Sequence, residues 1–359
     1  MVYLYKDIRI MKTARIREHE VMFEKRAGKM PARVIRAERK REKRNKKQAF
    51  RVIPQPKKNY KWLWISGSVL LLLILLIFLI ARDNNRISVH RVTMTHAQIP
   101  EAFDGYTILQ LTDFHGKTFG NMQERLLSLI NGLDYDMILL TGDYLSDPSS
   151  DDYWVILDVL DGLRKEVPVY YILGESDYLP ENADDLDDDW NMCITPKEKT
   201  ELMLLMEERG AEFVYPIQRI EKDGQYLYLT GVTYYEKAFD AVEFDSDKYF
   251  SICVTHRPIQ YDVDKRLKHV NEKSLKEVDY DASVSGHTHG GQFRLPLLGA
   301  VHVDGKGLFP QEQYAYGLHS AQGRLNFISS GLGADGVFRF RLYNTPEVAL
   351  ITLRCPKAP

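Results

Sequence analysis

The sequence predicts an α/β domain built on parallel strands, preceded by one transmembrane helix and a basic N-terminal tail. Three short apolar runs alternate with helical stretches, and each is long enough for one buried strand: Tyr106–Leu111, Asp136–Leu140 and Val167–Leu173. This alternation is typical of a parallel sheet, because two parallel strands need a crossover connection. A separate apolar run near the N-terminus predicts the transmembrane helix.

The apolar run Trp62–Ala81 carries no charge and shows no polar stripe. A helix needs ~20 such residues to cross a hydrocarbon core of ~30 Å, whereas a core helix of that length would carry polar residues along one face. Tyr60, Trp62 and Trp64 lie where an aromatic belt is found. A cleaved signal peptide fits less well, because the charged region before the run is far too long. We therefore expect a membrane span over residues 61–82.

Basic residues gather before this span. Up to Lys61 the chain has 21 Lys or Arg against 6 Asp or Glu, whereas the rest has 27 against 44. The positive-inside rule then predicts a single-pass protein of the cell membrane, with its N-terminus in the cytoplasm and the domain of residues 84–359 outside. Residues 1–60 are expected to form a partly helical or disordered tail that touches anionic lipid headgroups. No aromatic interleaving or known module supports nucleic-acid binding there.

Each of the three predicted strands ends in side chains that can hold a cation. Asp113 and His115 follow the first strand, Asp143 follows the second, and Glu175 follows the third. Parallel strands bring their carboxyl ends to one edge of a sheet, so these donors are expected to lie together. Singly, each would be an ordinary capping acid or a chance histidine. Their repetition at strand ends is what indicates a site.

Two later strands, Tyr249–Val254 and Tyr280–Ser285, also end in histidines. His256 and Arg257 follow the first, and the second is followed by Gly286-His287-Thr288-His289-Gly290-Gly291-Gln292. Residues two apart on an extended backbone share a face, so His287 and His289 can point at a common position. An isolated His-x-His is more often a pair of surface or hydrogen-bonding histidines. The other strand ends are what favour metal binding here.

Together the strand ends offer more donors than one ion needs. They are Asp113, His115, Asp143, Glu175, His256, His287 and His289. Two divalent or trivalent ions about 3.5–4 Å apart, with Asp143 shared between them, fit this number of donors. Mn, Fe and Zn all suit such donors. Two metals of this kind clamp a phosphoryl oxygen and lower the pKa of a bound water, so the sequence predicts hydrolysis of a phosphoester by metal-activated hydroxide.

The order of the blocks, Asp-x-His, Gly-Asp, Gly-x-x-Asp, His and Gly-His-x-His, resembles that of the calcineurin-like metallophosphoesterases. The segment Gly286–Gln292 is similar to the GHTHGGQ block of their membrane-anchored bacterial branch. The resemblance covers roughly residues 87–354 and implies a four-layer α/β/β/α sandwich with two metals along the strand ends. It implies a first metal held by Asp113, His115, Asp143 and His289, and a second held by Asp143, His256 and His287.

One block departs from the family pattern. Family members generally have Gly-Asn-His-Asp or Gly-Asn-His-Glu where this chain has Gly174-Glu175-Ser176-Asp177. A carboxylate at Glu175 adds negative charge, which suits a hard and highly charged ion. Ser176 occupies the position of the family's catalytic histidine, which stabilises the transferring phosphoryl group or protonates the leaving oxygen. Such assistance contributes about 10²–10⁴ in rate, and a serine provides it poorly.

Three explanations of this departure stay open. Another residue replaces the histidine, with Arg257, His302 and His319 as candidates. Alternatively, a good leaving group such as a nucleotide or pyrophosphate departs unaided, or the domain binds metal, is catalytically weak or inactive, and acts as a sensor. In the first two cases the chain is a membrane-anchored hydrolase of a phosphomonoester, phosphodiester or pyrophosphate. The short connection between Ala81 and Ile87 favours a lipid-linked or envelope substrate.

Overall fold

The structure is a computed structural model that describes most of the chain after residue 30. The described residues are 21, 22, 28, 31–49, 60–178, 198–215, 217–231, 248–259, 280–321, 323–336 and 339–356. The chain divides into two compact units, Met1–Val69 and Leu70–Pro359. The first unit contains helix α2 (Ala32–Ala49), which lies within the basic tail, and the start of α3 (Lys61–Asn84).

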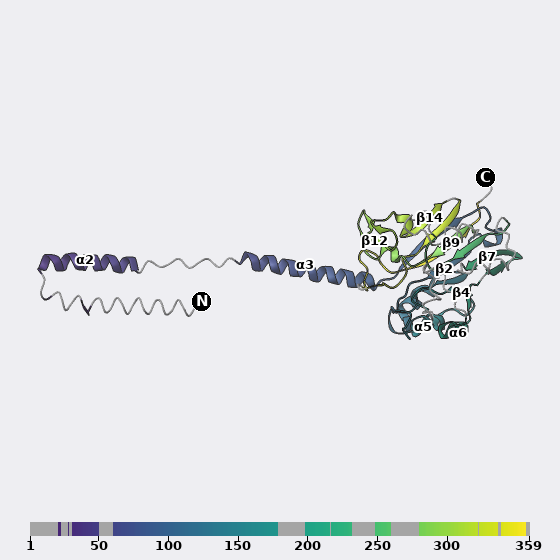
Figure 1. Cartoon of the computed structure of the whole chain (residues 1–359), viewed down its shortest axis with the longest axis horizontal. Coiled ribbons are helices and arrows are strands. Elements are labelled where there is room, and N and C mark those ends of the chain that lie inside the picture. Colours follow the sequence, from purple (N-terminus) through teal and green to yellow (C-terminus); the bar gives the residue numbers. More distant parts are fainter. Residues whose placement is uncertain are drawn as a thin grey trace. The chain divides into compact units, whose positions relative to one another are not determined.

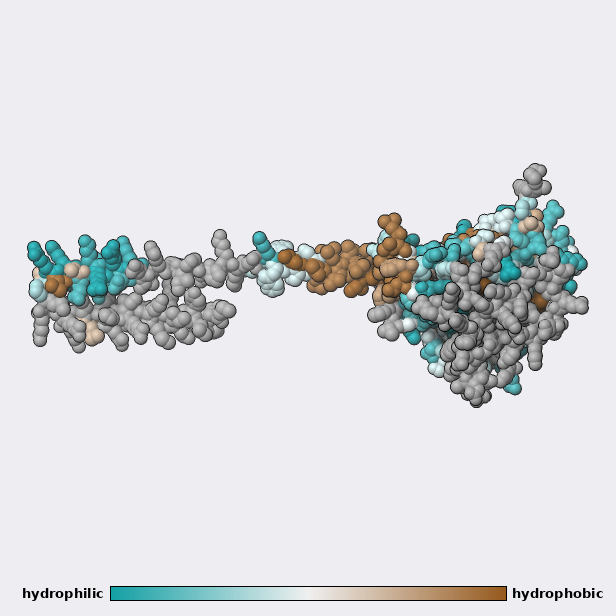
Figure 2. All heavy atoms as spheres, turned by 45° about the horizontal axis from the view of Figure 1, so that its top comes forward, coloured by the Kyte–Doolittle hydropathy of each residue, from teal (hydrophilic) through white to brown (hydrophobic). Residues whose placement is uncertain are grey.

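Helix α3 contains the apolar run and is the one described helix that is long and apolar enough to cross a membrane. Its 24 residues correspond to ~36 Å, more than the thickness of a hydrocarbon core. The apolar side chains of α3 are exposed, and Figure 2 shows them as a continuous brown surface. Polar residues return in the last turn, at Arg82, Asp83 and Asn84.

A six-stranded sheet carries the first three predicted site segments. Its strand order is β1-β16-β2-β3-β4-β5. The strands are β1 (Ser88–Thr95), β2 (Thr107–Leu111), β3 (Met137–Thr141), β4 (Val169–Ile172), β5 (Ala211–Phe213) and β16 (Glu347–Arg354). Strands β2 to β5 run parallel to one another, and β16 is antiparallel to β2. The carboxyl ends of β2, β3 and β4 therefore lie at one edge, as the sequence predicts.

A second six-stranded sheet carries the two histidine segments, and its order is β14-β15-β9-β8-β7-β6. The strands are β6 (Ile217–Lys222), β7 (Gln225–Gly231), β8 (Ser251–Val254), β9 (Ala282–Ser285), β14 (Gly317–Ala321) and β15 (Arg324–Ile328). Strands β7, β8, β9 and β15 are parallel. The ends of β8 and β9 therefore face one way, which is the requirement for His256 and His287 to meet.

Two hydrophobic cores hold the layers together. One core lies between the two sheets, and the other lies between the first sheet and helices α4 (Glu124–Ile130), α5 (Trp154–Gly162) and α6 (Glu201–Glu207). Successive residues of β2 serve different cores, because Ile108 belongs to the first and Leu109 to the second. Figure 1 shows this order of layers, with β7 and β9 nearest one side and α5 and α6 nearest the other. The α/β fold is confirmed; among the described residues three of its four expected layers are present.

Short elements complete the domain. Between β9 and β14 lie two hairpins, β10 (Arg294–Leu295) with β11 (Gly299–Ala300) and β12 (His302–Val303) with β13 (Gly307–Leu308). The 3₁₀ turns are η1 (Glu101–Phe103), η2 (Asn121–Gln123), η5 (His289–Gly291) and η6 (Glu312–Tyr314). The hairpins lie against the histidine segment: a Cβ atom on Gly291 would lie 2.4 Å from the Cβ of Ala300.

Candidate metal centre

The predicted donors lie at the carboxyl ends of five strands drawn from both sheets. Asp113 and His115 follow β2, Asp143 follows β3, Glu175 follows β4, His256 follows β8, and His287 and His289 follow β9. Backbone and side chain meet between the two sheets here: the His287 N–H donates to Asp113 Oδ1 at 2.9 Å and lies 3.2 Å from Oδ2. The two sheets are thus joined directly at the site.

Five candidate ligands have a left-handed backbone conformation, with φ between 45° and 69°. They are Asp113, His115, Asp143, His287 and His289. A non-glycine residue in this region costs about 1–3 kcal/mol and persists where the surroundings impose it. The surroundings here include close glycines, because a Cβ on Gly174 would lie 2.3 Å from Asp143 Oδ1, and one on Gly286 would lie 2.4 Å from Asp113 Oδ2. Such strain is typical of functional sites.

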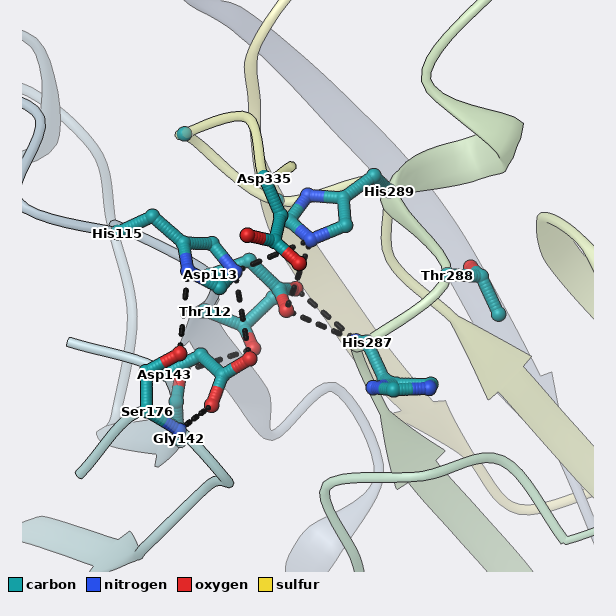
Figure 3. A network of polar contacts seen from close by, with 12 residues as sticks. Thr112, Asp113, His115, Gly142, Asp143, Ser176, His287, Thr288, His289 and Asp335 are labelled. Carbon is teal, nitrogen blue, oxygen red and sulfur yellow. Dashed lines mark hydrogen bonds and ion pairs between the residues drawn. The ribbon is translucent and has the colours of Figure 1, made fainter. Parts of the chain in front are cut away.

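One group of donors consists of Asp113, His115 and His289, all of them buried, with one ligand atom of each within 4.8 Å of the others. The Nε2 atoms of His115 and His289 face each other at 3.1 Å. His289 Nε2 also lies 4.0 Å from Asp113 Oδ1. Figure 3 shows the two rings and the carboxylate pointing at a common region.

A second group consists of Asp143, His256 and His287. Asp143 Oδ2 lies 3.0 Å from His256 Nε2 and 3.2 Å from His115 Nε2, which belongs to the first group. One carboxylate oxygen therefore contacts an imidazole of each group. This is the position that a carboxylate bridging two ions would occupy.

The hydrogen bonds of His256 show that the site suits a cation. Its Nδ1 lies 2.8 Å from the Thr141 carbonyl oxygen, which can only accept, so Nδ1 carries the proton. The other ring nitrogen, Nε2, is buried 3.0 Å from Asp143 Oδ2, so a positive charge, carried by a proton or by a bound metal ion, is favoured at this position. A ring nitrogen fixed in this way by a carbonyl oxygen is typical of metal-binding histidines.

Burial and the charges of neighbouring donors shift the pKa values of the groups in the site. Burial opposes the charge of Asp143 and His256, but their mutual attraction outweighs it, so the pKa of Asp143 falls well below its ordinary value and that of His256 rises to about 10. Burial, reinforced by the charge of His256, lowers the pKa of His287 to about 4. Burial also lowers the pKa of His289, with His115 and Arg341 adding to the effect. His287 and His289 are therefore neutral at pH 7 and able to donate lone pairs.

Glu175 has a different partner from the one that the sequence suggests. Its carboxylate forms an ion pair with the Arg257 guanidinium, and its Oε1 atom lies 3.8 Å from His287 Nδ1. Glu175 belongs to neither group of three described above. The acid that replaces the family's amide therefore holds an arginine beside the second group.

Ser176 contacts both groups without being a typical ligand. Its N–H donates to Asp143 Oδ1 at 2.8 Å, and its hydroxyl lies 3.2 Å from His115 Nδ1. Figure 3 shows Ser176 beside these two side chains. The other two candidates for the histidine's role lie elsewhere: His302 is exposed on β12, and the His319 Nε2 atom lies 2.6 Å from the Tyr316 carbonyl oxygen.

Asp177 is a supporting residue that the sequence analysis missed. Its buried carboxylate accepts hydrogen bonds from four backbone N–H groups, those of Asp143, Tyr144, Leu145 and Gly174. Burial and the charge of Asp143 raise its pKa to about 7, although these four donors oppose the shift. The turn that carries Asp143 is thus built around one carboxylate. The position of Asp177 at the end of the Gly174–Asp177 block was the one signal in the sequence that could have indicated this supporting role.

Arg341 was also missed, and nothing near it in the sequence suggests a site. It is buried, and its guanidinium donates to the carbonyl oxygens of Ser330 and Gly333. One nitrogen lies 3.4 Å from His289 Nδ1. Asp335 follows shortly after Gly333, and Figure 3 shows its carboxylate directed toward the rings of His115 and His289. The segment after β15 therefore surrounds the first group from a further side.

The fold and the site together define a two-sheet α/β protein with two adjoining groups of metal-binding side chains. The chain belongs to the calcineurin-like phosphoesterase family, whose model matches residues 106–291. The matched stretch runs from the start of β2 to η5 and includes all seven predicted donors. The family resemblance drawn from the sequence is therefore confirmed, and the family's use of divalent metal ions agrees with the two groups.

Three relatives show how far the similarity extends. The chain is 23% identical to the uncharacterized metallophosphoesterase YkuE of Bacillus subtilis over 73% of its own length and 84% of the relative. It is 23% identical to a transmembrane protein with metallophosphoesterase domain of Danio rerio, over 72% of this chain and 55% of that one. It is 24% identical to the phosphodiesterase YaeI of Escherichia coli, over 69% of this chain and 82% of the relative.

Proposed function

We propose that this chain is a membrane-anchored phosphoesterase that uses two metal ions to hydrolyse a phosphomonoester, phosphodiester or pyrophosphate bond. The observation that carries the proposal is the position of Asp143, whose Oδ2 atom contacts an imidazole of each donor group. Membership of the calcineurin-like phosphoesterase family supports the reaction class. So does the similarity to a phosphodiesterase of Escherichia coli.

We assign the ligands according to the two groups. The first metal would be held by Asp113, His115, Asp143 and His289, and the second by Asp143, His256 and His287. Imidazole nitrogen and carboxylate oxygen are donors that Mn, Fe and Zn all accept. When bound, such a pair acts as a Lewis acid on the phosphoryl group and lowers the pKa of a water.

Arg257 is our candidate for the phosphoryl-binding residue. Its guanidinium is half-buried beside the second group, and the Glu175 carboxylate fixes its position. A guanidinium offers paired N–H donors that match two phosphoryl oxygens. Glu175 is then a positioning residue, and Arg257 would take over part of the stabilisation that the family's histidine provides.

Ser176 is assigned a positioning role. Its N–H fixes one oxygen of Asp143, and its hydroxyl lies beside the Nδ1 atom of His115. A serine hydroxyl has too high a pKa to protonate a leaving oxygen near neutral pH. The site therefore suits a substrate whose leaving group departs without a proton, such as a nucleotide, a pyrophosphate or an aryl oxide.

Turnover of bis-p-nitrophenyl phosphate by the full chain in detergent with Mn²⁺ tests the hydrolase proposal. Asp143→Asn should lower the rate by at least ~100-fold, because it removes charge from the oxygen shared by both groups. Asp151→Asn alters an exposed acid of the same type and should leave the rate unchanged. Equal rates for Asp143→Asn and the unaltered protein would refute the assignment.

A metal-binding domain with little or no turnover is the second candidate, and Ser176 is the observation that favours it. Ser176→His restores the family's side chain beside His115. If the serine limits the rate, this variant should gain about 10²–10⁴ in turnover. A chain that binds two Mn²⁺ ions, hydrolyses nothing and gains activity only as Ser176→His would establish the second candidate and contradict the first.

Anchoring and orientation are also part of the proposal. α3 has the length and composition of a membrane span, and one relative is a transmembrane protein. The excess of basic residues before the span supports an orientation with the N-terminus in the cytoplasm and the domain outside. Protease added to intact cells should then digest the domain and leave the tail; digestion only after lysis would reverse the orientation.

A further inference from the structure

One edge of the domain exposes a group of large apolar side chains. Leu297, Leu298, Leu308, Phe309 and Tyr343 each expose more than half of their surface, and Phe340 exposes about a third. We call these six residues the apolar edge. The other exposed large apolar residues described in the domain after α3 are Met122, Trp154, Leu204 and Tyr215, which lie on other elements.

Four residues of the apolar edge belong to the two small hairpins: Leu297 and Leu298 lie in the turn of the first, and Leu308 and Phe309 lie at the open end of the second. The turn between β10 and β11 reads Pro296-Leu297-Leu298, and β13 ends in Leu308 before Phe309 and Pro310. Turns usually carry Gly, Asn, Asp or Ser, because these residues suit the backbone and the solvent. Neighbouring exposed apolar residues at a turn and at the end of a strand instead mark a contact surface.

The apolar edge is connected to the end of α3 by a series of hydrogen bonds and one ring contact. Asn84, the last residue of α3, bonds to the backbone of Arg341, and Arg294 N donates to the neighbouring Leu342 O at 2.9 Å. The rings of Phe293 and Phe340 lie 5.1 Å apart. Arg294 is the first residue of the hairpin whose turn contains Leu297 and Leu298.

Backbone hydrogen bonds also link the second hairpin to the first. Val301 N donates to Phe293 O at 2.8 Å, and Phe309 N donates to Val301 O at 2.9 Å. Figure 2 shows the outcome, because a further brown group stands at the edge of the domain beside the C-terminal end of α3. The exposed apolar side chains therefore lie next to the point where the apolar helix ends.

We propose that the apolar edge inserts into the lipid leaflet at which α3 ends, so that the domain rests on the bilayer by two contacts instead of one. The proposed membrane span of α3 is what identifies the partner as lipid. The segment that carries Phe340 and Tyr343 is hydrogen-bonded through Arg341 to Asn84 at the end of this span, so the apolar edge lies at the interface of the same bilayer. Exposed leucine and aromatic side chains have the composition of interfacial membrane contacts.

The same arrangement indicates the class of substrate, and this step rests on the proposed phosphoesterase function. The hairpins pack against the histidine segment, and the Arg341 guanidinium that follows Phe340 lies 3.4 Å from His289 Nδ1. A domain held by the apolar edge would keep the candidate metal centre close to the headgroup layer. The substrate class that fits is a phosphoester carried by a lipid of that bilayer.

Photocrosslinking tests the membrane contact without requiring turnover. The full chain is placed in nanodiscs of phosphatidylcholine and phosphatidylglycerol, with p-benzoylphenylalanine replacing Leu297, Phe309 or, as a control, the exposed Leu204 of α6. After irradiation, mass spectrometry should find lipid adducts at least about tenfold more abundant at positions 297 and 309 than at 204. Equal yields at the three positions, or adducts with a second copy of the chain, would overturn the proposal.

A pair of substrates with one leaving group tests the substrate class. The Leu297→Asp, Phe309→Asp double variant should cleave a diacylglycerol p-nitrophenyl phosphodiester embedded in the nanodiscs about tenfold more slowly, while its rate on soluble bis-p-nitrophenyl phosphate stays unchanged. Leu204→Asp should change neither rate. Unchanged cleavage of the embedded substrate by the double variant would refute the lipid-substrate inference. Failure of the unaltered protein on both substrates would instead count against the proposed function.

Discussion

The side chain of Asn84 forms two hydrogen bonds with the backbone of Arg341. Its Nδ2 atom donates to the Arg341 carbonyl oxygen at 2.7 Å, and its Oδ1 atom accepts from the Arg341 N–H at 2.6 Å. Both residues are buried, and Arg341 in turn lies beside His289. The last residue of the apolar helix and the first donor group are therefore connected through a single arginine.

Replacing Asn84 should destabilise the domain. Asn84→Ala leaves a buried N–H and a buried carbonyl of Arg341 without partners, at a cost of about 2 kcal/mol or more. Thermal unfolding of the full chain in detergent should show a lower Tm. Asn85→Ala is the matched control, because Asn85 is exposed and its side chain bonds only within its own helical turn, so its effect should stay within about 0.5 kcal/mol. Equal Tm values for the two variants would contradict the role given to Asn84.

Removing the charge of Asp177 should weaken metal binding. Asp177→Asn replaces an acceptor of four backbone N–H groups by an amide that can accept at only one atom, so the turn that carries Asp143 should shift. We expect Mn²⁺ affinity measured by calorimetry to fall about 10–100-fold. Asp134→Asn changes an exposed acid and should bind Mn²⁺ like the unaltered chain. Full affinity in Asp177→Asn would show that the turn holds without the carboxylate.

A methyl group on Gly333 should disrupt the loop that carries Asp113. A Cβ atom there would lie 2.0 Å from the Phe114 carbonyl oxygen, and backbone cannot move aside as a side chain can. Gly333→Ala should therefore lower the Tm and the occupancy by Mn²⁺, with overpacking costing about 1–3 kcal/mol. Gly132→Ala adds the same methyl group where the nearest atom would be 3.4 Å away. A Gly333→Ala chain as stable as Gly132→Ala would be inconsistent with this close approach.

Metal ions should stabilise the folded chain. Burial raises the pKa of Asp113 to about 6, against the attraction of His256, so its carboxylate is costly to ionise without a nearby cation. Mn²⁺ at 100 times its Kd should add about 2.7 kcal/mol to the free energy of unfolding, and chelation should remove this gain. The Tm of the unaltered chain and of His289→Ala should be compared with and without Mn²⁺. A gain of equal size in His289→Ala would exclude the first donor group as its source.

Local patterns in the sequence predicted the donors and the elements that carry them. The uncharged run before Ala81 and the apolar runs before Asp113 and Asp143 can be recognised from a few neighbouring residues. The structure places these runs in α3, β2 and β3. The pairing of Glu175 with Arg257 could not be predicted in this way, because 82 positions separate the two residues and the sequence gives no sign of their contact.

The sequence alone determined the apolar helix, the alternation of strands and helices, and the acids and histidines at the strand ends. Only the tertiary structure decided that Asp143 lies between two imidazoles, that Asp177 supports the turn beneath it, and that the apolar edge adjoins the end of α3. The physical reason is the distance along the chain between the residues that interact. Hydrophobic periodicity can be recognised within a single helix or strand. These contacts instead depend on how two sheets pack across a shared core and bring distant loops to one edge.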